Sequence, residues 1–94
     1  MAKYLGTWEM NQSLIPTNPK EMAAMVVKMA GMIKQEIKEG QLIDWGCSID
    51  GLTGYFLTAT SALETYKRAQ QYYPYVKLNI RKVLSVDDVL KAYK

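Results

Sequence analysis

The chain has 94 residues, 49% of them hydrophobic, and its 12 basic and 9 acidic side chains give a net charge of +3. This length allows one modest core, so we expect a single domain over residues 1–94. The sequence contains no histidine, which removes the commonest general base and the commonest metal ligand, and we expect neither a metal nor a cofactor. A lone cysteine, a start unlike a signal peptide and the lack of an apolar run near the ~20 residues that cross a bilayer favour a cytoplasmic protein without membrane contact.

The first two elements have clear local signals. Residues 3–11 alternate as a strand does, and its two faces would carry Tyr4, Trp8 and Met10 on one side and Leu5, Thr7 and Glu9 on the other. Two prolines then interrupt regular structure. Asn18 is a good N-cap and Pro19 suits the first helical position, so a helix follows and ends at Gly40. Its apolar stripe comprises Met22, Val26, Met29, Ile33 and Ile37.

Two further strands, residues 41–49 and 54–60, form a hairpin around Asp50 and Gly51. A loop of odd length would put Trp45 and Cys47 on one face with Tyr55, Leu57 and Ala59, whereas a two-residue turn would put them beside Phe56 and Thr58. We favour the odd loop because it collects the apolar residues on one face. Cys47 would then be a small buried hydrophobe, and without a histidine base it is not expected to act as a nucleophile.

The remaining chain predicts a helix, a strand and a short helix. Ser61 and Glu64 have the spacing of a capping box, and Pro74 ends the helix that follows. Its inward side would comprise Ala62, Tyr66, Ala69 and Tyr73. Residues 75–83 alternate as a half-buried strand, and Ser85 with Asp88 begins a C-terminal helix. The order βαββαβ plus a short helix predicts an α+β, ferredoxin-like fold with two helices on one face of the sheet.

The runs DWGCSIDGLTGYFLTATS and YPYVKLNIRKVLS, followed by the short terminal helix, resemble small members of the dimeric α+β barrel superfamily, which includes muconolactone-isomerase-like proteins. The resemblance implies a homodimer whose two sheets meet face to face, often around a small-molecule cavity. It implies no catalytic residue, because no family motif matches residue by residue. Several enzymes of the superfamily use histidine, which this chain lacks.

The open face of the predicted sheet is the candidate binding surface. Its expected ligand-binding residues are Thr7, Glu9, Ser48, Thr58, Asn79 and Arg81. Arg81 would bind a carboxylate, and Glu9 would lie near Arg81 or Lys77. The competing interpretation is an ordinary cross-strand ion pair on a half-solvated sheet. The expected function is small-molecule binding in a homodimer. The alternative is a small isomerase- or monooxygenase-like enzyme acting on an aromatic or carboxylic metabolite.

RNA binding is a further alternative, because RNA-recognition domains share the βαββαβ order and residues 67–82 hold five cations and no carboxylate. Those domains need a basic residue and three exposed aromatic residues around their third strand. Here Thr53 replaces the basic residue, and Leu57 and Thr60 occupy two of the aromatic positions. Nucleic acid is therefore not the expected partner.

Overall fold

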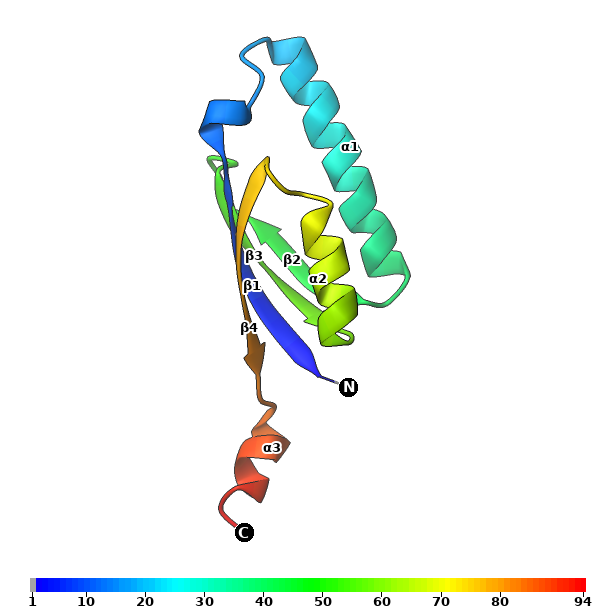
Figure 1. Ribbon diagram of the computed structural model, residues 1–94, viewed down its shortest axis with the longest axis vertical. Coiled ribbons are helices and arrows are strands. Elements are labelled where there is room, and N and C mark those ends of the chain that lie inside the picture. Colours follow the sequence, from blue (N-terminus) through cyan, green and yellow to red (C-terminus); the bar gives the residue numbers. More distant parts are fainter. Residues whose placement is uncertain (1) are drawn as a thin grey trace.

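The computed structural model describes residues 2–94 and has one four-stranded antiparallel sheet with helices beside it (Figure 1). The elements are β1 (Lys3–Met10), the short 3-10 helix η1 (Gln12–Leu14), α1 (Pro19–Lys38), β2 (Leu42–Cys47), β3 (Thr53–Ala59), α2 (Ala62–Gln70), β4 (Val76–Val83) and α3 (Val86–Lys91). The strand order is β2-β3-β1-β4, and α1 and α2 lie on the same side of the sheet. The α+β class and the predicted order of elements are confirmed.

Three helix ends follow their local sequence signals. The Asn18 side-chain oxygen accepts from the backbone N–H groups of Lys20 and Glu21, at 2.9 and 3.3 Å, and so caps α1. Gly40 follows the same helix with φ of 83°, a left-handed conformation that glycine adopts without strain. At α3, Ser85 and Asp88 form a reciprocal capping box.

The side of the sheet that faces the helices holds the core. Trp8, Met10 and Val76 form its buried centre, and partly buried residues such as Phe56 and Leu78 pack against them. The alternate residues of β1 and β4 point to the open side, as predicted: Leu5, Thr7 and Glu9 lie opposite Arg81, Asn79 and Lys77, in that order.

Glycines make room for aromatic rings across the sheet. A Cβ added to Gly54 would overlap the Trp8 indole and the Gly46 carbonyl oxygen, so only glycine fits beneath that ring. Trp8 thus reaches from β1 over β3 to β2, where it stacks on Trp45 with ring centroids 5.5 Å apart and an interplanar angle of 11°.

The hairpin has an even-length loop, so the prediction of an odd loop is wrong. Ser48 N–H donates to Thr53 O at 2.8 Å, which leaves residues 49–52 as the loop, and Trp45 lies opposite Phe56. Polar contacts hold this turn: Asp50 Oδ1 accepts from the Ser48 hydroxyl and from Leu52 N–H. Consequently the apolar residues of β3, namely Tyr55, Leu57 and Ala59, lie on the open face with Leu5 as a neighbour of Leu57.

The inward side of α2 also differs from the prediction. Tyr66 and Tyr73 are 63% and 71% exposed, whereas Thr65 is buried and Ala69 and Tyr72 are partly buried. Of the predicted residues, Ala69 lies inward and Ala62 is exposed, while Thr65 and, just beyond the end of α2, Tyr72 take the inward positions expected for Tyr66 and Tyr73. A buried polar contact explains the inward position of Tyr72, because its hydroxyl donates to Glu36 Oε2 on α1 at 3.2 Å.

The C-terminal helix lies apart from the rest of the molecule. It extends past the end of β4 (Figure 1), and the molecule measures 57 Å along its longest axis against 23 and 22 Å along the others. Its hydrophobic side chains are exposed, with Val86 at 72% and Leu90 at 54%, and Tyr93, which follows the helix, is 87% exposed. Among residues 2–94, the structure contains no helix whose length and hydrophobicity would let it cross a membrane.

Candidate functional site

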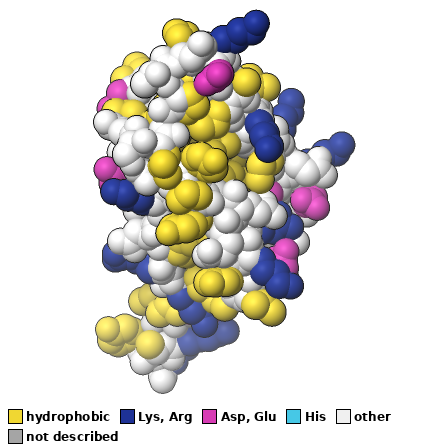
Figure 2. Space-filling model, turned by 45° about the horizontal axis from the view of Figure 1, so that its top comes forward, with side chains coloured by type: hydrophobic (Ala, Val, Ile, Leu, Met, Phe, Trp, Pro, Cys, Tyr) yellow, Lys and Arg dark blue, Asp and Glu magenta, His cyan; other side chains and the backbone are white. Residues whose placement is uncertain are grey.

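The helix-facing side of the sheet holds a cavity of about 260 Å³ between the sheet and the helices. Four residues of the apolar stripe of α1 line it, namely Met22, Val26, Met29 and Ile33. Met29 also packs against the buried core, whereas Met22 and Val26 are exposed at 40% and 48%. The helix approaches the sheet most closely at β2. The apolar part of the lining includes Trp8, Met29, Ile33, Leu42, Trp45 and Phe56. Hydrophobic side chains reach the surface in a band down the middle of the molecule (Figure 2).

Besides Arg68 Nε, which faces a carboxylate, three buried polar atoms of lining residues have no hydrogen-bond partner within residues 2–94. They are Trp8 Nε1, the side-chain carbonyl oxygen of Gln41 and the hydroxyl oxygen of Thr58. Trp8 and Thr58 are each 8% exposed, so water does not reach them freely from outside. Buried polar groups are nearly always paired, and each unpaired group costs about 1–3 kcal/mol. Trp8, Gln41 and Thr58 therefore bring an unpaired N–H donor, an unpaired carbonyl acceptor and an unpaired hydroxyl, each almost fully enclosed, to the wall of a mostly apolar cavity.

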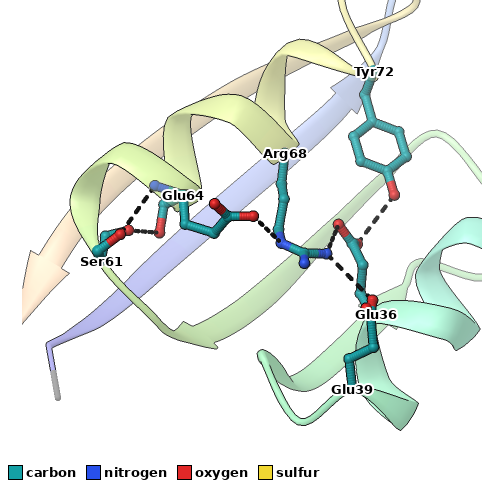
Figure 3. A network of polar contacts seen from close by, with 7 residues as sticks. Glu36, Glu39, Ser61, Glu64, Arg68 and Tyr72 are labelled. Carbon is teal, nitrogen blue, oxygen red and sulfur yellow. Dashed lines mark hydrogen bonds and ion pairs between the residues drawn. The ribbon is translucent and has the colours of Figure 1, made fainter.

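A charged network lies where α1, α2 and the cavity meet (Figure 3). Arg68 of α2 is surrounded by three carboxylates: its Nη1 lies 3.1 Å from Glu36 Oε1 and 3.8 Å from Glu39 Oε1, and its Nε lies 3.3 Å from Glu64 Oε1. The last contact is an ion pair without hydrogen-bond alignment. The Glu36 side chain is 11% exposed and that of Arg68 is 20% exposed.

The same network perturbs Tyr72. Burial raises the pKa of its hydroxyl, and the negative charge of Glu36 together with the hydrogen bond to that carboxylate raises it further. Tyr72 is therefore a hydrogen-bond donor at neutral pH. Glu36 and Arg68 also line a shallow groove on the outer side of α1 and α2, so their ion pair separates the cavity from that groove.

The residues predicted from sequence do not form one site. Thr7 and Asn79 are direct neighbours on the open face, where Glu9 lies opposite Lys77 and Arg81 lies opposite Leu5. Among residues 2–94, the Glu9 and Lys77 side chains make no ion pair.

Ser48 and Thr58 are separated from that group. Ser48 belongs to the hairpin turn, where its hydroxyl contacts Asp50 and Thr53. The placement of Thr58 on the open face is wrong: it points toward the helices and lines the cavity, because the hairpin register differs by one residue.

Cys47 lies on the helix-facing side, in the lining of the cavity, but it is exposed and not buried as predicted. Its thiol donates to the Ser48 carbonyl oxygen at 3.3 Å. Among residues 2–94, no three His, Cys, Asp or Glu side chains are grouped so that they could hold a metal ion.

Comparison of the chain with protein-family models, with curated proteins and with solved structures finds no match in any of the three. The cavity and its polar groups are therefore interpreted from their own chemistry.

Sequence reasoning missed Glu36, Gln41, Arg68 and Tyr72. One signal was present: Glu36 lies three residues after Ile33 and seven after Met29, so it shares their side of α1. Ile37, the last residue of the predicted stripe, is 46% exposed, so its predicted inward position is wrong. A carboxylate near an apolar stripe indicates a partner cation on a neighbouring element. The pattern does not tell which of the 12 basic residues that partner is.

Proposed function

We propose that the protein binds a small, mostly apolar molecule in the cavity between α1 and the sheet. The observation that carries this proposal is the combination of about 260 Å³ of space with three unpaired polar atoms in its lining. Binding sites for small molecules are typically apolar and contain a few polar groups that orient the ligand. The sequence led us to expect the ligand between two sheets, and that location remains a prediction for a dimer.

The two tryptophans of the chain are built-in reporters, because Trp8 and Trp45 both line the cavity. Titration of ¹⁵N-labelled protein with indole, a neutral probe, is expected to shift the indole N–H signals of both residues. The variant Ala30→Phe places a ring in the cavity and is expected to abolish these shifts. Its control, Ala23→Phe, adds the same ring to α1 outside the lining and should retain them. Equal binding by the two variants would place the indole elsewhere.

We also propose that the fold is ferredoxin-like and that two copies associate through their open sheet faces, as in a dimeric α+β barrel. The open face supports this proposal because it carries the apolar residues Leu5, Tyr55 and Leu57 at its centre. Water-exposed apolar patches of this kind usually mark an interaction surface. Glu9 and Arg81 both lie around the patch, so a two-fold pairing that sets Glu9 of one copy against Arg81 of the other brings unlike charges together.

The exposed apolar helix α3 supports the same association. Strand spacing and rise give the sheet face a flat area of about 500 Å². Stable interfaces bury about 800 Å² on each partner, so the sheet face alone falls short. The exposed side chains of α3, including Val86 and Leu90, supply the additional apolar surface, and Figure 2 shows hydrophobic side chains at the lower end of the molecule.

Sedimentation velocity over 1–100 µM protein tests the dimer. The wild type is expected to sediment as a dimer, and Leu57→Lys at the centre of the open face is expected to sediment as a monomer. The control Val27→Lys introduces the same charge on the exposed side of α1, where Val27 is 72% exposed, and should remain dimeric. A monomeric wild type at all of these concentrations would contradict the proposal.

A further inference from the structure

The size of the cavity limits what it holds. An apolar cavity of about 150 Å³ in another protein binds benzene, which has six non-hydrogen atoms. By the same ratio, a volume of about 260 Å³ accommodates a ligand of about ten non-hydrogen atoms. That size corresponds to a bicyclic ring or to one ring with a short side chain.

The charges around the cavity disfavour an anion. Within residues 2–94, Arg68 is the only cation in the lining, and the carboxylates of Glu36, Glu39 and Glu64 already surround it within 4 Å. The lining also includes Asp50. An incoming carboxylate would find no free cation and would approach a net negative charge, an unfavourable interaction that grows stronger with burial.

The unpaired polar atoms favour a neutral partner. Trp8 Nε1 donates a hydrogen bond, the Gln41 carbonyl oxygen accepts one, and the Thr58 hydroxyl does either. Each matches a neutral carbonyl, amide or hydroxyl group without the desolvation cost of a buried charge. Each of these hydrogen bonds also removes the penalty of a buried polar atom that is otherwise left unpaired.

We infer, on the basis of the proposed cavity site, that the ligand is a neutral molecule of about ten non-hydrogen atoms that carries both a hydrogen-bond donor and an acceptor. Carboxylic acids, which the sequence suggested as ligands of Arg81, are excluded from the cavity by its surplus of carboxylates. The ligand class is thus set by the pairing of Arg68 and by the unpaired groups of Trp8, Gln41 and Thr58.

Cinnamamide and cinnamate test this inference, because the two probes share their shape and size and differ in charge at pH 7. Each is titrated into ¹⁵N-labelled wild-type protein while the indole N–H signals of Trp8 and Trp45 are followed. The amide is expected to bind at least tenfold more tightly than the carboxylate. Equal affinities, or tighter binding of cinnamate, would refute the inference that the ligand is neutral. The proposal that a small molecule binds in the cavity would still stand.

Two variants of equal charge change provide the control. Glu36→Gln removes a carboxylate from the lining. It is expected to lower the ratio of the cinnamamide affinity to the cinnamate affinity at least threefold. Glu21→Gln removes a carboxylate from the first turn of α1, outside the lining, and should leave the ratio of the two affinities unchanged. If indole binds and neither cinnamyl probe does, the inferred class is wrong. If indole fails as well, the proposed binding function fails with it.

Discussion

Replacement of Arg68 by methionine is the sharpest test of how α1 and α2 are held together. Methionine keeps much of the aliphatic volume but removes the charge that Glu36, Glu39 and Glu64 share. Glu36 would then remain at 11% side-chain exposure without its cation, beside two further carboxylates. Breaking a buried ion pair in this way costs about 3–5 kcal/mol, because one charge is left desolvated and unpaired.

That loss is large for this chain. A domain of 94 residues has a free energy of unfolding of about 5–14 kcal/mol, so Arg68→Met would remove about a fifth or more of it. With a urea dependence of about 1–1.5 kcal/mol per molar for a domain of this size, the unfolding midpoint should fall by at least about 2 M at pH 7.

Urea unfolding followed by circular dichroism measures this loss. The control Lys34→Met removes a positive charge from an exposed position of α1 and should change the unfolding free energy by about 0.5 kcal/mol or less. The double variant Glu36→Gln/Arg68→Met removes both partners and should recover much of the loss. A loss below about 1 kcal/mol for Arg68→Met would refute the assignment of this network as a buried, stabilising contact.

Two further predictions concern the aromatic residues. Gly54→Ala should destabilise the fold by about 1–3 kcal/mol and abolish the near-ultraviolet dichroism of the tryptophan stack, because the added Cβ displaces the Trp8 ring. Gly31→Ala lies in the exposed middle of α1 with nothing within 4 Å of the added Cβ, and it should instead stabilise the fold by about 0.5–1 kcal/mol. Equal effects of the two changes would contradict the close packing of the Trp8 ring on Gly54. Since burial and Glu36 raise the pKa of Tyr72, the unfolded chain loses that proton first, and stability falls as the pH rises past about 10. Tyr72→Phe should therefore show a shallower loss of stability between pH 9 and 11.5 in urea titrations, and a slope identical to wild type would count against this role of Tyr72.

Local sequence signals predicted the elements because their causes are local. The Asn18 cap, the left-handed Gly40 and the Ser85–Asp88 capping box each depend on residues within four positions of one another. The alternation in β1 was equally informative, since Trp8 and Met10 are apolar where the strand faces the core.

The hairpin shows where this reasoning failed. Collecting apolar residues on one face assumed that only one face of the sheet would be covered. The structure places Tyr55 and Leu57 on the open face, and the proposed second copy would cover them there. The helix-facing row instead contains Gly54, which is needed because the Trp8 ring occupies the space above it. The residue pattern of β3 does not show that the Trp8 ring of β1 packs on Gly54, because the two residues are 46 positions apart in the chain. They become neighbours only when β1 and β3 pair in the sheet.

The order of the strands and helices along the chain, their caps and the lack of histidine chemistry could be predicted from the sequence, because each depends on neighbouring residues or on composition. The hairpin register, the inward side of α2 and the position of the cavity became known from the folded molecule. These depend on contacts between distant residues, above all those of Glu36 with Arg68 and Tyr72, 32 and 36 positions apart. Such contacts depend on three-dimensional distance and burial, which no local spacing in the chain encodes.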